Sequence, residues 1–110
     1  MNENQLSIDE GSINFWLKAG SIDFQEEGKF LPLFQNTDSQ GNSIFILRDS
    51  DKKIKMFHVK MGKGRTDIEY NVSELSNSKD HMFTFTWSVD KKEIKMYIDG
   101  VLAGRSEIKY

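Results

Sequence analysis

Residues 82–104 decide the fold, and they read Met82-Phe-Thr-Phe-Thr-Trp-Ser-Val-Asp-Lys-Lys-Glu-Ile-Lys-Met-Tyr-Ile-Asp-Gly-Val-Leu-Ala-Gly104. Apolar side chains alternate with polar ones through the first part, as in a strand that buries one face: Phe83, Phe85, Trp87 and Val89. After a polar turn the alternation resumes at Ile94, Met96 and Ile98. Asp99-Gly100 then supplies the positive φ angles that a two-residue hairpin turn requires. The stretch therefore predicts three antiparallel strands joined by two tight turns.

The rest of the chain shows the same two-residue alternation and little sign of long helices. It predicts further strands over residues 12–18, 31–35, 43–48, 53–61 and 65–72. Pro32 places the second of these at a sheet edge or a strand start, and residues 73–80 are predicted to hold one helical turn capped by Ser73. Short strands with turns about every 8–12 residues predict an all-β antiparallel sandwich or barrel. Strand parity predicts a core of Ile13, Phe15, Leu17, Phe83, Phe85, Trp87, Ile94, Met96 and Ile98.

Length and composition bound the possibilities for this chain. Its 110 residues suit one domain over residues 1–110, either complete or one module of a larger protein. The absence of cysteine excludes a disulfide scaffold and a thiolate metal site. A net charge of −2 with mixed signs gives no basic footprint for nucleic acid. We expect no membrane insertion, because no apolar run approaches the ~20 residues of a transmembrane helix, and the first residues do not read as a signal peptide.

Three pieces of the chain together resemble a known family. They are Gly11-Ser-Ile-Asn-Phe-Trp-Leu-Lys18, then Leu33-Phe34 with the two strands that follow it, and the stretch from Phe83-Thr-Phe-Thr-Trp87 to Tyr97-Ile-Asp-Gly-Val-Leu102. Their order and spacing resemble a concanavalin A-like jelly-roll domain of the laminin G or pentraxin type. One detail departs from the family, in which a tryptophan usually precedes the histidine, whereas Asp80 precedes His81 here. The resemblance implies a non-catalytic, lectin-like module that binds carbohydrate. It also implies an extracellular or cell-surface localisation if the chain is part of a larger exported protein.

The chain is shorter than family domains usually are, and the strand that follows their Asp-Gly hairpin is missing. The sandwich is then minimal, or part of a larger protein, or covered at its open edge by a partner. An uncovered edge favours association, so we predict a homodimer through the segments around Leu6 to Ile8 and Glu107 to Tyr110. A protein-interaction or structural module that associates through a sheet edge is the alternative function.

Hydrolysis is the third function considered, because some relatives with this jelly roll cleave β-glucans. Their motif places carboxylates at alternate positions of one strand. The nearest match here is Arg65-Thr-Asp67-Ile-Glu69, in which Arg65 stands where the nucleophile belongs. We therefore predict no catalytic residues and no enzyme, and we interpret the stretch as a solvated strand face.

Calcium is the cofactor that the resemblance implies, because laminin G and pentraxin relatives often bind it through loop oxygens. The candidate metal ligands are Asp49, Asp51 and Asp38, with Asn42 in the same set of loops. The simpler interpretation is that these residues form turns through their own side chains.

The candidate ligand-binding residues are Tyr97, Trp16, His58 and Asn71. An aromatic ring on the outer face of a sheet can stack on a sugar. Tyr97 is equally compatible with an outer face and a covered one, whereas Phe15-Trp16-Leu17 favours a strand covered on both sides. His58 shares strand parity with Ile54 and Met56, which also fits a partly buried structural histidine. Together with His81 it supplies too few ligands for a zinc site.

Overall fold

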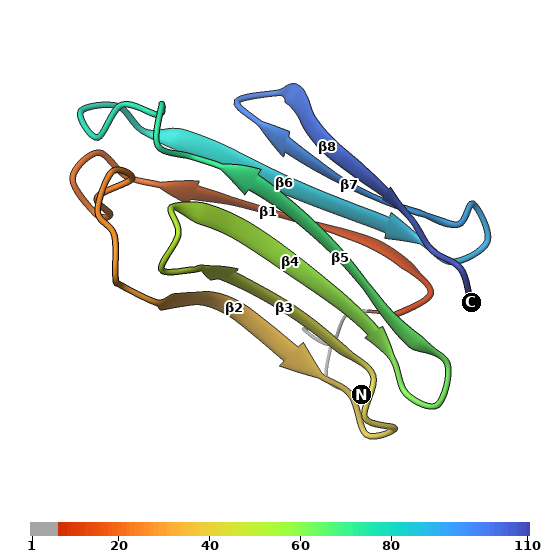
Figure 1. Cartoon of the computed structure of the whole chain (residues 1–110). Coiled ribbons are helices and arrows are strands. Elements are labelled where there is room, and N and C mark those ends of the chain that lie inside the picture. The colour runs from red at the N-terminus through yellow and green to blue at the C-terminus, as the bar shows by residue number, and fades with distance from the viewer. Residues whose placement is uncertain (1–6) are drawn as a thin grey trace.

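The computed structural model describes residues 7–110, and these form an all-β sandwich (Figure 1). The strands are β1 (Glu10–Leu17), β2 (Leu31–Thr37), β3 (Ser43–Arg48), β4 (Lys53–Lys60), β5 (Gly64–Asn71), β6 (His81–Ser88), β7 (Glu93–Ile98) and β8 (Val101–Glu107). All of the strands predicted from alternation are present, with bounds that differ by a few residues. The helical turn predicted over residues 73–80 is wrong, because that segment forms turns. No helix that could cross a membrane occurs in the part of the chain that the structure describes.

Two antiparallel sheets of four strands make up the layers of the sandwich. Sheet A has the order β1-β6-β7-β8, and sheet B has the order β2-β3-β4-β5. The sheets pack face to face, and β5 contacts β8 across the two layers (Figure 1). β2, which carries Pro32, is an edge strand of sheet B, as the proline predicted. This arrangement is an antiparallel jelly-roll sandwich.

The core lies between the sheets and is built from the inward side of each alternating strand. The predicted residues of β6 and β7 are all buried there: Phe83, Phe85, Trp87, Ile94, Met96 and Ile98. Ile13, Phe15 and Leu17 of β1 are half-buried and pack against this cluster. The Phe15 ring stacks on Phe83 and Phe85 at centroid distances of 5.9 and 6.0 Å. Sheet B supplies the opposite wall, chiefly through Ile44, Ile46, Ile54, Met56 and Ile68.

The hairpin predicted at Asp99-Gly100 is confirmed by its backbone. The two residues have φ angles of 53° and 83°, which is the left-handed conformation that a type I′ turn requires at both central positions. Asp99 also stabilises the turn through its side chain, because its Oδ1 accepts the N–H of Met82 at 2.9 Å. The turn therefore joins β7 to β8, and the side chain of Asp99 links it to the start of β6.

The two ends of the described chain are folded back into the sandwich. Ile8 is buried, and its carbonyl oxygen lies 2.7 Å from Nε2 of His58. Ile108 is buried as well, and its N–H donates to the carbonyl of Lys92 at 2.8 Å. These segments were predicted to pair with a second copy. The Ile8 carbonyl and the Ile108 N–H are used within the chain instead, and Leu6 lies outside the described residues. The homodimer itself stays a prediction.

Candidate ligand-binding face

The outer face of sheet A, which points away from the core, brings Trp16 and Tyr97 into one area. Trp16 lies on β1 opposite Met82 of β6. In the neighbouring row, Asn14 lies opposite Thr84, and Thr84 lies opposite Tyr97 of β7. The two aromatic residues are thus separated by one strand and shifted by one cross-strand row.

Trp16 is far more exposed than its neighbours in sequence led us to expect. The side chain is 55% exposed, because β1 is an edge strand and no second layer covers its outer side among the described residues. The expectation of a doubly covered strand is therefore wrong for this position. Tyr97 is half-buried between Thr84 and Leu102, so only part of its side chain is open to a ligand.

Polar groups suited to hydroxyl ligands lie directly beside the indole ring. Nδ2 of Asn14 donates to Oγ1 of Thr84 at 3.2 Å and contacts Sδ of Met82 at 3.3 Å. These contacts hold the amide in place on the sheet and leave its Oδ1 as a hydrogen-bond acceptor. An exposed aromatic ring next to an oriented amide and a hydroxyl can accept both the apolar face and the hydroxyl groups of a sugar.

His58 lies in the interior rather than on this face. It is fully buried, its Nδ1 lies 2.7 Å from the hydroxyl of Tyr110, and its Nε2 lies 2.7 Å from the carbonyl oxygen of Ile8. Burial lowers the pKa of its imidazole, with a smaller opposing contribution from the Ile8 carbonyl. Both ring nitrogens have protein partners, which agrees with the interpretation of His58 as a buried structural histidine. The side chain is not available to a ligand at the surface.

Asn71 lies on the outer face of sheet B, on the other side of the molecule from Trp16. It faces Lys53 across the strand pair, and its Oδ1 accepts the N–H of Ser73 at 2.8 Å. The structure therefore does not bring Asn71 together with Trp16 and Tyr97.

The three aspartates expected to bind calcium do not converge. Asp38 precedes β3, whereas Asp49 and Asp51 follow it, so the six residues of β3 separate them by about 20 Å. Oδ1 of Asp38 accepts the N–H groups of Gln40 and Asn42, and Oδ1 of Asp49 accepts those of Asp51 and Lys53. These are the turn contacts of the simpler interpretation. Residues 7–110 contain no cluster of three acidic or histidine side chains placed to hold a metal, and the three predicted aspartates lie at two separate places in the fold.

The strand that resembles a glucanase motif carries paired charges. Nε of Arg65 lies 2.8 Å from Oδ1 of Asp67, and Glu69 pairs with Lys53 at 2.9 Å. Phe45 and Phe57 form an aromatic pair beside them that was not predicted from the sequence. The two rings meet edge to face with centroids 6.3 Å apart, and the Arg65 guanidinium lies 5.0 Å from the centroid of the Phe57 ring. The signal was available, because both phenylalanines have the opposite parity to Ile44, Ile46 and Met56.

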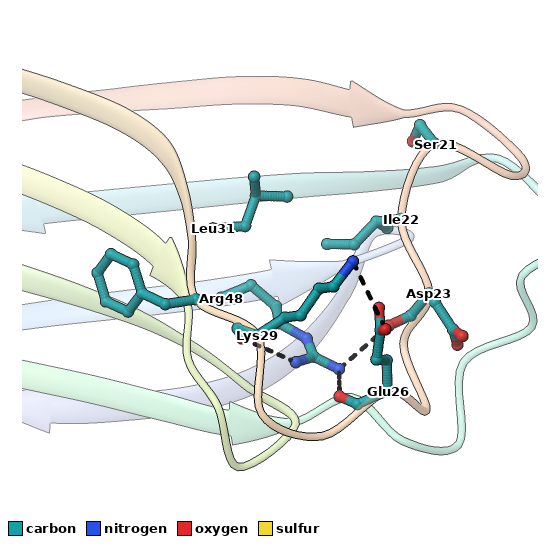
Figure 2. A pocket seen from close by; sticks show the side chains of 8 residues that line it. Ser21, Ile22, Asp23, Glu26, Lys29, Leu31 and Arg48 are labelled. Carbon is teal, nitrogen blue, oxygen red and sulfur yellow. Dashed lines mark hydrogen bonds and ion pairs between the residues drawn. The ribbon is translucent and has the colours of Figure 1, made fainter.

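A pocket of about 210 Å³ lies where the β1–β2 loop crosses the end of β3 (Figure 2). Arg48 forms its floor and is fully buried. The guanidinium donates to backbone carbonyls only, those of Asp23, Phe24, Glu26, Lys29 and Asp49. Arg48 therefore fixes the path of the loop, and both terminal nitrogens are occupied by that task. The exposed rim includes Phe30 and Leu31.

Comparison with known proteins places the chain in a family. The family model described as the concanavalin A-like lectin/glucanases superfamily matches residues 1–110. A search of curated proteins finds no match. Among solved structures, domains LG4-5 of the mouse laminin alpha1 chain superpose with a TM-score of 0.70 at 11% identity, covering 98% of this chain and 26% of that one.

A carbohydrate-binding module is also similar in structure. The CBM40 of the Ruminococcus gnavus IT-sialidase bound to alpha2,3 sialyllactose superposes with a TM-score of 0.64 at 13% identity, covering 93% of this chain and 55% of that one. A second structure of the Ruminococcus gnavus IT-sialidase CBM40 superposes with a TM-score of 0.65 at 12% identity, covering 94% of this chain and 55% of that one. The chain thus spans about a quarter of the laminin structure and about half of the CBM40 structure. At these identities the likeness concerns the fold, and the family follows from the match over the full sequence: the chain belongs to the concanavalin A-like lectin/glucanases superfamily.

Proposed function

We propose that this chain is a non-catalytic, lectin-like module that binds carbohydrate on the outer face of sheet A. The observation that carries the proposal is the exposed indole of Trp16 beside the oriented amide of Asn14 and the hydroxyl of Thr84. Full burial of a large apolar side chain is worth about 1.5–3 kcal/mol, and Trp16, at 55% exposed, forgoes roughly half of that. A ligand with an apolar face recovers part of that free energy on binding, and its hydroxyl groups then meet polar partners.

The structural neighbours and the paired charges of β5 support the same reading. One structural neighbour is a CBM40 bound to alpha2,3 sialyllactose, which makes carbohydrate a reasonable ligand class for this fold. Arg65 stands where a retaining glycosidase carries its nucleophilic carboxylate, and it pairs with Asp67, so we propose binding without turnover. The laminin neighbour further suggests an extracellular setting.

A glycan array tests this proposal directly. The purified chain should bind at least one class of glycan, both with added calcium and with a chelator, because Asp38 lies at the opposite end of β3 from Asp49 and Asp51. Trp16→Ala should weaken that binding about tenfold, since an aromatic stacking contact is worth about 1.5 kcal/mol. Phe30→Ala is the matched control, because Phe30 is 58% exposed but lies at the Arg48 pocket. Failure of the parent chain to bind any glycan, or equal binding by Trp16→Ala, would overturn the proposal.

Association through the edge of β8 is the second candidate function, and one observation favours it. Val101 is 69% exposed and Leu102 is 52% exposed. They border an apolar cleft of about 330 Å³ with Tyr70 and Leu75. Within the described residues β8 has a strand neighbour on one side only, so a second copy can pair with it about a two-fold axis.

Sedimentation at micromolar concentration decides this second candidate. A dimer that Val101→Lys converts to a monomer would support pairing through β8. A monomer at all concentrations, with glycan binding retained, would exclude it and leave the lectin-like module in place.

A further inference from the structure

The pocket between the β1–β2 loop and the end of β3 has an unused hydrogen-bond donor in its floor. Nη1 and Nη2 of Arg48 donate to carbonyl oxygens of the β1–β2 loop and of Asp49. The Nε of Arg48, by contrast, has no partner among residues 7–110. Arg48 is 2% exposed, so bulk water does not satisfy this N–H. An unsatisfied buried donor is costly, and an oxygen atom of a ligand in the pocket would remove that cost.

Apolar side chains stand around this donor. Ile22 of the β1–β2 loop and Leu31 at the start of β2 line the pocket with Arg48 (Figure 2). Phe30 adds an exposed ring to the rim. A cavity of about 150 Å³ accommodates benzene, and this pocket has a volume of about 210 Å³. Its size therefore suits one ring with a small substituent.

The charged groups at the pocket cancel, both in its lining and in the segments beside it. Two charges of each sign line it: Asp23, Glu26, Lys29 and Arg48. In the same loop, Glu27 pairs with Lys52 at 2.9 Å. After β3, Asp49 pairs with Lys55 at 3.1 Å. Because no net charge is left to attract an ion, the pocket suits a neutral ligand.

Lys29 is the side chain that can move to admit a ligand. It lines the pocket together with Arg48 (Figure 2). Its side chain is 72% exposed, and its Nζ lies 3.6 Å from Oε2 of Glu26. A surface ion pair of this kind holds a side chain only weakly. Lys29 can therefore turn into solvent while its carbonyl oxygen keeps the hydrogen bond from Arg48.

We propose that this pocket binds a small neutral molecule made of one apolar ring and a carbonyl group. The ring packs against Ile22 and Leu31, and the carbonyl oxygen accepts the N–H of Arg48 Nε once Lys29 has turned away. This site shares no residue with the proposed carbohydrate face, so it would give the chain a second, independent ligand.

NMR of the nitrogen-15-labelled chain tests this contact directly through the Nε–H signals of the arginines. The chain has three arginines, so Arg65→Lys and Arg105→Lys identify the signal of Arg48 by elimination. Benzamide should bind and move the Arg48 Nε–H signal downfield, because its carbonyl oxygen accepts that hydrogen.

Three further probes separate the parts of the ligand. Benzene lacks an acceptor, so it should bind about fivefold more weakly than benzamide and cause no such downfield shift. Acetamide lacks the ring and should also bind more weakly. Benzoate has the shape of benzamide with a negative charge, and it should bind no more tightly than benzamide.

Variants locate the binding site. Leu31→Ala should weaken benzamide binding several-fold, because it removes a wall of the pocket, and Leu31 is exposed enough for the fold to tolerate the change. Val101→Ala is the matched control, because Val101 is an exposed apolar side chain on β8. Trp16→Ala should leave benzamide binding unchanged.

Four results would overturn this inference. They are no binding of benzamide, binding without a downfield shift at Arg48, tighter binding of benzoate, and equal binding by Leu31→Ala and the parent chain. None of them bears on the lectin-like module, which the glycan array decides.

Discussion

Two buried histidines at opposite ends of the sandwich are held by different chemistry. His58, at the end where the described chain begins and finishes, contacts the Tyr110 hydroxyl and the Ile8 carbonyl. His81, at the end where the long loops meet, lies 2.7 Å from Oδ2 of Asp99 and 2.9 Å from the carbonyl oxygen of Ser76. The first site is neutral apart from the ring, and the second contains a carboxylate.

The contrast shows what decides the charge of a buried imidazole. Burial lowers the pKa of both rings, because removal from water disfavours the charged form. At His81 the hydrogen bond and the charge of Asp99, with the Ser76 carbonyl, outweigh burial and raise the pKa overall. At His58 no such partner is in contact, and the pKa stays lowered. The terminal end of the sandwich is therefore held by the neutral contacts of His58, and the loop end by the charged contact between His81 and Asp99.

The largest expected effect concerns the loop end, where Arg48 is buried as well as His81. Arg48→Met keeps an unbranched side chain but leaves buried carbonyl oxygens of the β1–β2 loop without a donor. Each such oxygen costs about 1–3 kcal/mol, so we expect urea unfolding to show a loss of about 3 kcal/mol or more.

Arg105→Met is the matched control, because Arg105 is half-exposed and its pair with Glu93 lies at the surface. Exposed pairs contribute about 0–1 kcal/mol. Equal losses in the two variants would show that the Arg48 contacts do not hold the loop end together.

The next effect concerns the terminal end. The hydroxyl of Tyr110 lies 2.7 Å from Nδ1 of His58 and donates to the His58 carbonyl at 2.8 Å. Tyr110→Phe removes this link and leaves the ring in place, so we expect urea unfolding to show a loss of about 1–2 kcal/mol. Tyr97→Phe, on the outer face of sheet A, should change stability by a few tenths at most. A neutral result for Tyr110→Phe would mean that water replaces the hydroxyl without cost.

The sequence predicts the strands but not the partners of the buried polar side chains at either end, for a physical reason. The strands and the core of β6 and β7 follow from alternation, which is local, and Asp99-Gly100 follows from backbone chemistry. The partners of His58 and Arg48 do not, because Tyr110 is 52 positions from His58 and Phe24 is 24 positions from Arg48. Strand parity predicted correctly that Trp16 lies on the outer face of its strand. The exposure of that face was not predicted, because alternation cannot distinguish an edge strand from a central one.

Asp99→Asn should convert the charged contact at His81 into a neutral one. The asparagine oxygen can still accept the Met82 N–H, so the turn keeps its geometry. A charged hydrogen bond contributes about 1 kcal/mol more than a neutral one. We therefore expect a loss of about 1 kcal/mol below pH 6.5, where His81 carries its proton, and a smaller loss at alkaline pH. A loss independent of pH would mean that Asp99 acts on the turn and not on the histidine.

The smallest and most diagnostic effect is the dependence of stability on pH between about 5 and 8. The pKa of His58 lies below the ordinary value of 6.5. The unfolded chain therefore binds more protons than the folded chain in the window beneath 6.5, and stability rises with pH there. The pKa of His81 lies above 6.5. Its contribution is fully present below 6.5 and is lost as pH rises through the folded-state value.

Together the two histidines predict a maximum of stability near pH 6.5. His58 causes the fall in stability below this pH, and His81 causes the fall above it. Proton NMR of the two imidazole rings should show one titration on each side of that value. His81→Gln should flatten the upper limb of the stability curve, and Asp99→Asn should lower the pKa of His81 without moving that of His58. Lys60 and Asp9 near His58 and Lys79 near His81 act on the rings with smaller weight. If both rings titrate below 6.5, the carboxylate of Asp99 does not outweigh burial at His81, and burial governs both ends.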